Sequence, residues 1–412
     1  MEDFFGNKLV ELNKPIRLIT LFSGYGSQEM AMRNIGADFE IWKAVEFDEK
    51  AMKSYNILHG TDFKPIDIRD VRGKDLGIIE TDKYDYIMFY SFPCQSLSSA
   101  GQQKGMVEGS GTSSSLLWEV KRIMKELNES ELPKVLIMEN VPQVRAKKNI
   151  KEFDKWLSFL RSKGYKNFCQ DLNAKDYGIP QNRIRCFCVS ILSESEEYEF
   201  PKPIELKNHL KDILERHVDE SYYIDNEKTR KLLLKNKNSE VSDKIIRMGT
   251  LECKGYGEGY RVMNPNGLSS VVKSEGGGYG ILICEDPKVY SCAIRGRKVN
   301  GNYNQTLEIG DRSTANSITT CYEASMLVEG SDKPRIRKLT EKEKGRLMGV
   351  KDSDIERMKS VNTKSQIERQ FGNSIVTSVL SAIFLQLGIQ GKKRWNEMSE
   401  KEIEPLWNLI GK

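Results

Sequence analysis

Short apolar runs of strand length alternate with helical patterns across the first half of this 412-residue chain. Such alternation is typical of an open, doubly wound α/β sheet with helices on both faces. A sheet of this kind binds its ligands just beyond the carboxyl ends of its strands, so we expect the functional side chains there. The apolar runs lie at 16–22, 41–47, 84–90, 135–141, 168–173 and 184–189, and the helical patterns at 28–35, 49–58, 116–127 and 150–162.

The cysteine that follows the run 84–90 is the candidate nucleophile. Cys94 lies within Ser91-Phe-Pro-Cys-Gln95 and precedes a stretch rich in Gly and Ser, 96–115. A cysteine just past a strand end, beside a flexible loop, is well placed to attack a substrate. A single cysteine is more often a small buried hydrophobic side chain. The flanking proline and the loop favour the nucleophile.

A glycine turn follows the first strand and opens the first helical pattern. Ser23-Gly-Tyr-Gly-Ser27 has the geometry that brings backbone close to a nucleotide-like ligand. The third glycine of the dinucleotide fingerprint is absent, so a plain tight turn is an equal alternative. Glu46, near the next strand end, is placed to accept hydrogen bonds from ribose hydroxyls. Asp67 can contact an adenine amino group while Ile68 packs on the ring, with ordinary loop packing as the alternative.

An acid and two arginines follow later strands. Glu139 ends an apolar run, where a carboxylate is costly unless it is partnered or functional. Burial would raise its pKa, which suits a proton donor near neutral pH, while the alternative is a carboxylate capping a turn. Arg183 and Arg185 share one face of an extended segment and can form a fork for phosphate, carboxylate or a base edge. Solvated surface arginines are the usual alternative.

The second half of the chain has a different texture. The stretch 205–238 is highly charged and partly helical in pattern, and 249–328 consists of short segments rich in Gly, Ser, Thr and Asn. We therefore expect a second domain rich in strands and loops. Basic side chains lie there between two tyrosines and suit a nucleic-acid surface, with a solvated loop face as an equal alternative. They are Arg295, Arg297 and Lys298.

The last hundred residues predict helices on either side of a linker. A helix is expected at 340–348, with acidic residues in its first turn. We interpret 352–370 as a polar linker and 371–387 as an amphipathic helix.

Composition limits the class of protein. A chain of this length exceeds one ordinary core and suggests two domains. No window approaches the ~18 apolar residues of a membrane span, and the first fifteen residues lack the apolar core of a signal peptide. The eight cysteines include no CxxC pair and histidines number three, which predicts reduced thiols, no metal site and a cytoplasmic protein. Without heptads or a large exposed apolar helix face, we expect a monomer. The net charge of +5 permits a polyanionic partner.

Six motifs, in this order, resemble those of the cytosine-5 DNA methyltransferases of the bacterial and phage type. Together they span nearly the whole chain, and each alone is weak. They are Leu21-Phe-Ser-Gly-Tyr-Gly26, Phe92-Pro-Cys-Gln95, Glu139-Asn-Val141, Gln181-Asn-Arg-Ile-Arg185, Leu339-Thr340 with Arg346-Leu-Met-Gly349, and Gly372-Asn-Ser374.

The resemblance implies a mechanism in which cytosine carbon 5 of duplex DNA is methylated. Cys94 would attack carbon 6, Glu139 would protonate or hydrogen-bond ring nitrogen 3, and Arg185 with Arg183 would hold the base carbonyl and neighbouring backbone. S-adenosylmethionine would supply the methyl group. The target base must leave the duplex, so the loop 96–115 would close over it. The loop residues expected to approach DNA are Gln102, Gln103 and Lys104.

The resemblance also implies a Rossmann-like, S-adenosylmethionine-dependent methyltransferase domain at 1–198, completed by 365–412, and a smaller target-recognition domain at 199–364. Ser27 stands where many members have a third glycine, and Ser113-Ser-Ser115 precedes Leu116 where an arginine is common. The second departure leaves the anchoring of the catalytic loop open. The cofactor contacts would be Phe22, Gly24, Tyr25, Gly26, Glu46, Asp67, Ile68, Pro93, Leu116, Asn373 and Ser374.

Three alternatives remain at this point. An RNA cytosine-5 methyltransferase would carry the same motifs, although the long region 200–335 favours the reading of duplex sequence. A catalytically silent relative would bind DNA or a partner, but it has no need of an aligned nucleophile and acid. A dinucleotide oxidoreductase rests only on the glycine turn and lacks the fingerprint.

Overall fold

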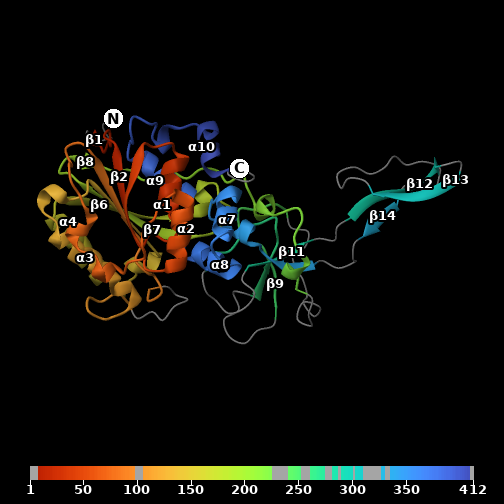
Figure 1. Cartoon of the computed structure of the whole chain (residues 1–412), viewed down its shortest axis with the longest axis horizontal. Helices are drawn as coiled ribbons and strands as arrows, with labels where there is room; N and C mark the ends of the chain where they lie inside the picture. The colour runs from red at the N-terminus through yellow and green to blue at the C-terminus, as the bar shows by residue number, and fades with distance from the viewer. Residues whose placement is uncertain are drawn as a thin grey trace.

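A computed structural model of the chain shows a large body built around one sheet and a smaller part rich in strands (Figure 1). No helix in the described part of the chain is long and apolar enough to cross a membrane. The structure describes residues 8–97, 105–224, 240–251, 260–273, 281–285, 289–299, 302–309, 326–329 and 335–408.

The central sheet has six strands in the order β3-β2-β4-β5-β7-β6. Strands β3, β2, β4 and β5 are parallel, whereas β7 is antiparallel to β5 and β6 is antiparallel to β7. The doubly wound α/β class predicted from the sequence is confirmed. Because β7 runs backwards, its first residues lie at the carboxyl edge of the parallel strands. The strands are β2 (Ile16–Leu21), β3 (Phe39–Val45), β4 (Asp85–Tyr90), β5 (Val135–Asn140), β6 (Tyr165–Asn173) and β7 (Ile184–Leu192).

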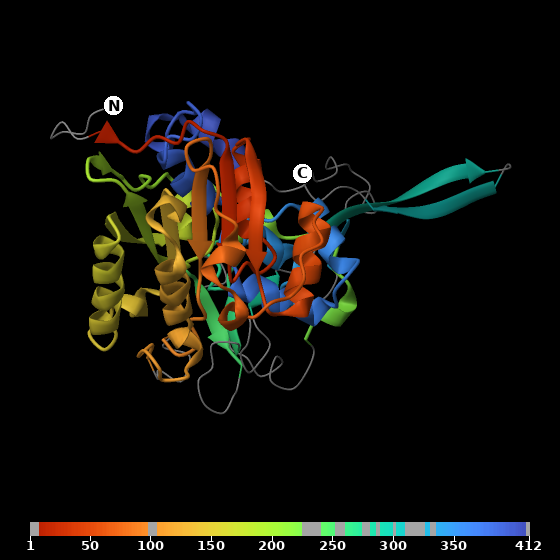
Figure 2. The same ribbon diagram turned by 60° about the vertical axis from the view of Figure 1, so that its left-hand side comes forward.

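Alternating side chains of the strands fill two separate cores, one on each face of the sheet. In β5, Val135 and Ile137 belong to the core beneath α1 (Ser27–Asn34) and α9 (Thr377–Gln386). Leu136 and Met138 belong to the other core, beneath α3 (Leu117–Glu126) and α4 (Ile150–Ser162). Figures 1 and 2 show these helix pairs on opposite sides of the sheet. This two-faced burial explains why the strands consist almost entirely of apolar residues.

The prediction of a polar linker at 352–370 is wrong. The structure has two helices there, α7 (Asp352–Lys359) and α8 (Lys364–Asn373). Each buries a pair of apolar residues at helical spacing, which the many charged residues around them obscured. The pairs are Ile355 with Met358 and Ile367 with Phe371.

The helix predicted from residue 371 also differs from the structure. It begins at Thr377 as α9, and all ten of its residues are buried, so it is not amphipathic. The helix expected at 340–348 is confirmed as α6 (Glu341–Arg346), which Thr340 caps. Its capping box explains why the start was visible in the sequence.

The small part holds two sheets of short strands, as predicted. The first has the order β15-β11-β10-β9 and the second β13-β12-β14, which extends away from the body in Figure 1. In the described residues of 205–238, the expected helical structure consists of two short 3₁₀ helices at Leu210–Ile213 and Glu220–Tyr222. The strands are β9 (Arg247–Thr250), β10 (Arg261–Met263), β11 (Leu282–Glu285), β12 (Val289–Val299), β13 (Asn302–Ile309), β14 (Met326–Glu329) and β15 (Arg335–Lys338).

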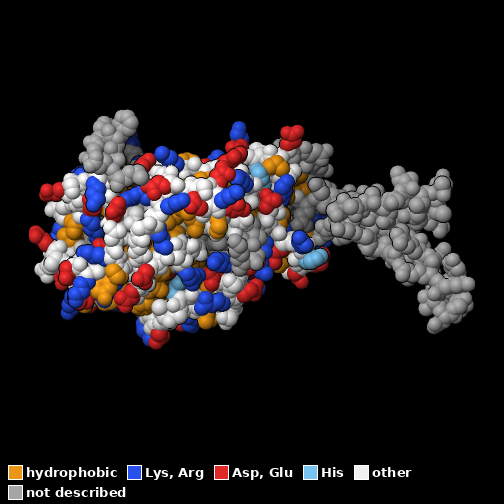
Figure 3. Space-filling view, turned by 90° about the horizontal axis from the view of Figure 1, so that it is seen from above, with side chains coloured by type: hydrophobic (Ala, Val, Ile, Leu, Met, Phe, Trp, Pro, Cys, Tyr) orange, Lys and Arg blue, Asp and Glu red, His pale blue; other side chains and the backbone are white. Residues whose placement is uncertain are grey.

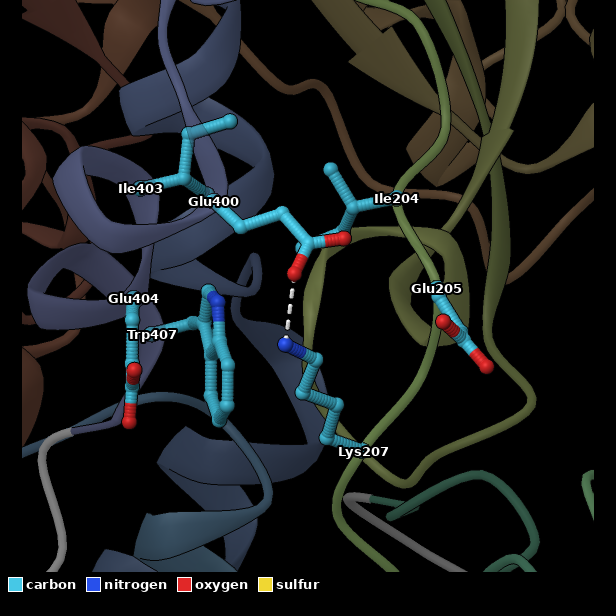
Figure 4. Close-up of a pocket in the computed structure, with 7 residues that line it drawn as sticks. All are labelled: Ile204, Glu205, Lys207, Glu400, Ile403, Glu404 and Trp407. Atoms are coloured by element: carbon cyan, nitrogen blue, oxygen red, sulfur yellow. Dashed lines mark hydrogen bonds and ion pairs between the residues drawn. The ribbon is translucent and has the colours of Figure 1, made fainter.

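The C-terminal segment packs against the N-terminal segment and against residues 204–207. Arg394 donates from Nη2 to the carbonyl of Val10 at 2.7 Å, next to the short parallel pair β1 (Lys8–Leu9) and β8 (Glu196–Glu197). Helix α10 (Glu400–Trp407) packs beside residues 204–207, where Lys207 pairs with Glu400 at 2.6 Å (Figure 4). The pocket between them measures about 20 Å³, room for about one water molecule and not for a cofactor.

Two cysteines depart from the prediction of reduced thiols. Cys169 in β6 and Cys188 in β7 face each other across the antiparallel pair and form a disulfide. Direct opposition on neighbouring strands brings two side chains together, and no spacing in the sequence reveals it. Cys94 and Cys186 are free thiols. Within the described ranges, no group of three His, Cys, Asp or Glu residues could hold a metal ion.

Charges on the surface of the body are mixed in sign. Figure 3 shows Lys and Arg side chains interspersed with Asp and Glu over one face. This mixture agrees with the small net charge of +5.

Candidate active site

The segment that carries Cys94 is held from both sides at the carboxyl edge of the sheet. It leaves β4 after Tyr90, and the amide of Asn140 donates to the carbonyl of Phe92 at 2.9 Å. On the other side, the hydroxyl of Ser114 donates to the carbonyl of Pro93 at 2.7 Å. The carbonyl of Cys94 itself accepts from the Leu97 amide at 2.9 Å, which closes a turn. The thiol is therefore presented on a fixed backbone.

The serines at 113–115 answer the question of how the loop is anchored. Ser114 also accepts from the Ser96 amide at 3.3 Å, and the hydroxyls of Ser96 and Ser113 lie 3.1 Å apart. Ser113 and Ser114 thus bind Ser96 at the start of the loop to the 3₁₀ helix Ser113–Leu116 at its end. Leu116 lies at the end of this helix, partly buried against the core.

Glu139 and Arg185 face each other at the same edge. Arg185 Nε lies 3.2 Å from Glu139 Oε1. Burial raises the pKa of Glu139, and the positive charge of Arg185 lowers it, with burial the larger effect. The carboxyl group therefore keeps a proton more readily than an ordinary glutamate, which is the property of a proton donor.

The same charges act on Cys94. Burial raises the pKa of its thiol most, the negative charge of Glu139 raises it further, and Arg185 lowers it. Cys94 follows β4 and Glu139 lies near the end of the neighbouring parallel strand β5, so the thiol and the acid leave the sheet at the same edge. The raised pKa favours the protonated thiol.

Arg183 takes different partners from Arg185. It is 3% exposed, and its Nη atoms donate to the carbonyls of Val272, Gly372 and Ser374 at 2.9, 3.1 and 2.5 Å. Burial lowers the pKa of Arg183 to about 9, which still leaves the group charged at neutral pH. The two arginines therefore do not form one fork, since only Arg185 points its guanidinium at Glu139.

The glycine turn lies beside the acid predicted to bind ribose. Gly24 and Gly26 have φ values of 58° and 86°, and Phe22 has a φ of 60°, which is rare for a bulky residue and marks a constrained loop. The Gly24 amide donates to Glu46 Oε2 at 2.9 Å. Burial raises the pKa of Glu46. The glycine turn, residues 22–26, and Glu46 thus lie side by side after β2 and β3, and we call them together the rim.

Phe47 is a residue that the sequence interpretation missed. It follows Glu46 directly, and its side chain is 68% exposed. An exposed aromatic ring beside the acid predicted to bind ribose would offer a flat surface for an adenine ring. The position of Phe47, directly after an acid at the end of a strand, was the sequence signal that could have indicated an exposed ring.

Asp67 and Ile68 lie next to this rim. The amide of Ile66 donates to the carbonyl of Glu46 at 2.8 Å, which brings the segment alongside. Hydrogen bonding to Arg69 lowers the pKa of Asp67. Ile68 is buried. A contact between Asp67 and adenine stays a prediction, because the carboxylate already accepts hydrogen bonds from Arg69.

The predicted C-terminal contacts come back to the first helix. The hydroxyls of Ser27 and Ser374 lie 2.5 Å apart across 347 residues of sequence. Tyr25 packs edge-on against Phe371, with ring centroids 5.8 Å apart. Asn373 ends α8 just before Ser374. Ser27, which replaces the glycine found in many family members, therefore contributes a hydroxyl to the contact between α1 and Ser374, where a glycine would contribute none.

The predicted DNA contacts are only partly visible. Gln102, Gln103 and Lys104 lie outside the described residues. Arg295, Arg297 and Lys298 lie on β12, where Arg297 is opposite Asn304 of β13 and Lys298 is opposite Tyr303.

A parallel-rich sheet with a glycine turn after one strand and an acid after the next is consistent with the fold of S-adenosylmethionine-dependent methyltransferases, and Cys94 follows a third strand of the same sheet. The model of the C-5 cytosine-specific DNA methylase family matches residues 16–388. The chain belongs to this family, whose methyl donor is S-adenosylmethionine. The resemblance inferred from the motifs is confirmed.

Relatives agree with this assignment. The chain is 28% identical to the type II methyltransferase M2.ScrFI of Lactococcus lactis subsp. cremoris, over 90% of this chain and 99% of the relative. It is 31% identical to the orphan methyltransferase M.SssI of Spiroplasma monobiae, over 84% and 76%. It is 29% identical to the type II methyltransferase M.HhaI of Haemophilus parahaemolyticus, over 90% and 94%.

Solved structures show the same fold. The S. pombe Dnmt2 methyltransferase has a TM-score of 0.58 at 19% identity, covering 90% of this chain and 97% of its own. A putative DNA modification methyltransferase from an E. coli prophage has a TM-score of 0.52 at 16% identity, covering 96% and 99%. At these identities the likeness concerns the fold alone.

Proposed function

We propose that this enzyme methylates carbon 5 of a cytosine in double-stranded DNA, through a covalent bond between Cys94 and carbon 6 of the flipped-out base. The observation that carries the proposal is the convergence of Cys94, Glu139 and Arg185 at one edge of the sheet, with Glu139 and Arg185 3.2 Å apart. A binding module has no use for a buried acid aligned with a thiol.

The three side chains divide the work on the base. Attack of the Cys94 thiolate on carbon 6 pushes the electron pair of the 5,6 double bond to carbon 5, which becomes nucleophilic. Glu139 donates its proton toward ring nitrogen 3, and Arg185 holds the base carbonyl. After carbon 5 has taken the methyl group, loss of the carbon 5 proton supplies the electron pair that expels the thiolate, and return of the nitrogen 3 proton to Glu139 restores the neutral aromatic ring.

The protonated state of Glu139 favours ionisation of the Cys94 thiol. The negative charge of Glu139 raises the pKa of Cys94. A Glu139 that holds its proton for the base exerts no such effect, while Arg185 continues to favour the thiolate. The protonated acid that the base needs is thus also the state in which the nucleophile ionises more easily.

The rim beside this site fits the methyl donor. The glycine turn leaves room at the backbone, Glu46 suits ribose hydroxyls, and the exposed ring of Phe47 suits adenine. S-adenosylmethionine, when bound, supplies the methyl group. The contacts expected for it at Asn373 and Ser374 belong to the same proposal.

The small part would read the DNA. We assign 199–364 to target recognition and 1–198 with 365–412 to the catalytic domain, acting as a monomer. Paired strands such as β12 and β13 can enter a major groove, and Arg295, Arg297 and Lys298 on β12 would contact base edges and phosphates. Gln102, Gln103 and Lys104 would approach the DNA from the catalytic loop.

The experiment that tests this function uses duplex DNA containing 5-fluorocytosine. Fluorine at carbon 5 cannot leave as a proton does, so the reaction should stall as a protein–DNA adduct. Mass spectrometry should locate the adduct on Cys94, and the Cys94→Ser variant should form none while it still binds DNA. Replacement of Cys284, a buried cysteine of the small part, should leave the adduct intact.

Other results would select the alternatives. An adduct on fluorinated transfer RNA but on no duplex would identify an RNA methyltransferase. No adduct on either nucleic acid, with DNA binding retained, would identify a catalytically silent relative.

A further inference from the structure

A buried cluster of polar side chains lies next to the glycine turn, between α1 and α2 (Glu49–His59). Glu29 of α1 accepts at Oε1 from the hydroxyl of Tyr55 at 2.7 Å and from that of Thr20 at 3.0 Å. Tyr55 and His59 are four residues apart and share one face of α2, with ring centroids 4.7 Å apart. Glu29 is 1% exposed and Tyr55 is 0% exposed. We call Glu29, Tyr55 and His59 the turn support.

His59 holds the glycine turn directly. Its Nε2 atom lies 3.0 Å from the carbonyl oxygen of Tyr25, and because a carbonyl oxygen only accepts, Nε2 carries the hydrogen of this bond. The preceding residue, Gly24, donates its amide to Glu46 Oε2 at 2.9 Å. The two central residues of the turn are therefore fixed by two side chains, one from α2 and one that follows β3.

Glu29 Oε2 lies close to the same nitrogen of His59. A β-carbon added to Gly26 would stand 2.2 Å from His59 Nε2 and 2.9 Å from Glu29 Oε2, so both atoms lie against one face of Gly26. Glu29 Oε2 has no hydrogen-bond partner within the described residues, although it is buried. The N–H group of His59 thus binds the Tyr25 carbonyl and has a second acceptor nearby.

The charge of Glu29 selects between these two acceptors. Burial raises the pKa of Glu29 to about 7, while the hydrogen bond from Tyr55 acts in the opposite direction. A carboxylate accepts a hydrogen bond much more strongly than a neutral carboxyl group does. Loss of the Glu29 proton therefore draws the N–H group of His59 away from the Tyr25 carbonyl, and the turn loses one of its attachments.

The other titratable groups of the cluster keep their charge state near neutral pH. Burial lowers the pKa of His59 to about 4, so its imidazole is uncharged at neutral pH. Burial raises the pKa of Tyr55 well above its ordinary value, and it also raises that of Tyr25 on the turn. Glu29 is therefore the member of the turn support that changes its charge near pH 7.

The charged side chains around the turn support come from α1 and α7, which lie beside α2 in Figure 1. Arg33 of α1 lowers the pKa of Glu29, and Arg33 and Arg357 of α7 lower the pKa of His59. Asp354 of α7 pairs with Arg33 at 2.8 Å. Helix α9 also packs against α1 but carries no charged residue. Because the guanidinium groups stay charged, they influence Glu29 without responding to pH themselves.

We propose that Glu29, Tyr55 and His59 are positioning residues for the methyl donor, because they hold the glycine turn in the shape that receives it. The inference rests on the proposed position of the donor at the rim. Neutral Glu29 leaves His59 on the Tyr25 carbonyl, so the donor binds more tightly. Ionised Glu29 weakens donor binding by about fivefold, which corresponds to one hydrogen bond. By thermodynamic linkage, a bound donor in turn keeps the proton on Glu29.

The test measures the Kd of S-adenosylhomocysteine by calorimetry from pH 6 to pH 8.5, with the full chain and without DNA. Over this range the Kd should rise by about fivefold more in the unaltered protein than in Glu29→Gln. The amide of the variant is uncharged and still accepts from Tyr55, so it represents neutral Glu29. Titration of the ligand and of Glu46, whose pKa burial also raises, is common to both proteins and cancels in the comparison.

Two variants of α2 separate this role from a contribution to stability alone. The Tyr55 hydroxyl lowers the pKa of Glu29, so Tyr55→Phe should move the weakening of S-adenosylhomocysteine binding to higher pH. His59→Phe keeps a ring beside Tyr55 but loses the N–H donor. It should bind S-adenosylhomocysteine about fivefold more weakly at pH 6 and show no pH response beyond that of Glu29→Gln. A merely structural role would lower the melting temperature and leave both pH dependences as they are.

Asp85→Asn is the matched control. Asp85 is 8% exposed and burial raises its pKa, but it begins β4 at the amino edge of the sheet, opposite the rim. Its replacement should leave the pH dependence of S-adenosylhomocysteine binding unchanged.

Two results would overturn the role of the turn support. One is a Kd of the unaltered protein that follows Glu29→Gln across the pH series, and the other is a pH response that Tyr55→Phe does not move. Should Glu29→Gln fail to fold, Tyr55→Phe and His59→Phe decide the outcome. A wrong donor position would show instead as S-adenosylhomocysteine binding that Phe47→Ala leaves unchanged, and a wrong reaction as the absence of the DNA adduct.

Discussion

Arg185 Nε lies 3.2 Å from Glu139 Oε1, between the end of β5 and the start of β7. An ion pair this close would normally keep a glutamate ionised. Burial nevertheless outweighs the arginine and raises the pKa of Glu139. Arg185 therefore positions the carboxyl group of Glu139, and the net effect of the site still favours its protonated form.

Glu139→Gln should lower kcat by about 10²- to 10⁴-fold, because the amide cannot give a proton to the base. In the unaltered enzyme, activity should fall as pH rises through the raised pKa of Glu139, and the residual activity of the variant should lack this fall. Steady-state methyl transfer across a pH series measures both. A variant with wild-type kcat, or one whose only defect is a lower melting temperature, would contradict the assignment.

Ser114→Ala should lower kcat by about fivefold, since a hydrogen bond of roughly 1 kcal/mol no longer holds the backbone beside Cys94. The KM for S-adenosylmethionine should change little. Ser110→Ala is the control in the same loop, because its hydroxyl lies at the exposed surface, 3.1 Å from that of Thr112. Equal rates for the two variants would show that Ser114 has no part in presenting the thiol.

Phe47→Ala should raise the KM for S-adenosylmethionine by about tenfold, through loss of a stacking surface worth roughly 0.5–1.5 kcal/mol. The melting temperature should stay the same, because the ring is 68% exposed. Ile79→Ala, at another exposed apolar residue, is the control. An unchanged KM would remove Phe47 from the cofactor rim.

Glu29→Gln should make stability less dependent on pH. Burial raises the pKa of Glu29 from 4.5 to about 7, and its Oε2 has no partner within the described residues. Folding therefore favours the protonated form, and the free energy of unfolding falls as pH rises from about 4.5 to about 7.

The amide of the Glu29→Gln variant stays neutral and can still accept from Thr20 and Tyr55. The variant should gain stability over the unaltered protein by up to roughly 3 kcal/mol at pH 8 relative to pH 4.5. Urea unfolding at both pH values measures this difference. A difference that does not change with pH would show that Glu29 titrates normally.

Much of the catalytic body was readable from local patterns. The strands around Cys94 and Glu139 are short apolar runs bounded by turn residues, and the helix at 150–162 matches α4 at both ends. The helices at 352–373 were not readable, because charged residues dominate them and packing against α1, α2 (Glu49–His59) and α6 defines their buried sides. Arg33 of α1, for example, donates to Asp354 of α7 at 2.8 Å.

The sequence by itself determined which residue types stand at each strand end, because strand length, turn chemistry and motif order are properties of neighbouring residues. Tertiary structure alone decided how they meet. The reversed direction of β7 brings Arg185 to Glu139, and the return of α8 brings Ser374 to Ser27. The same long-range packing places Arg183 against the carbonyl of Val272 and brings Cys169 and Cys188 together in a disulfide. Such contacts depend on the arrangement of whole elements, and no local sequence pattern specifies them.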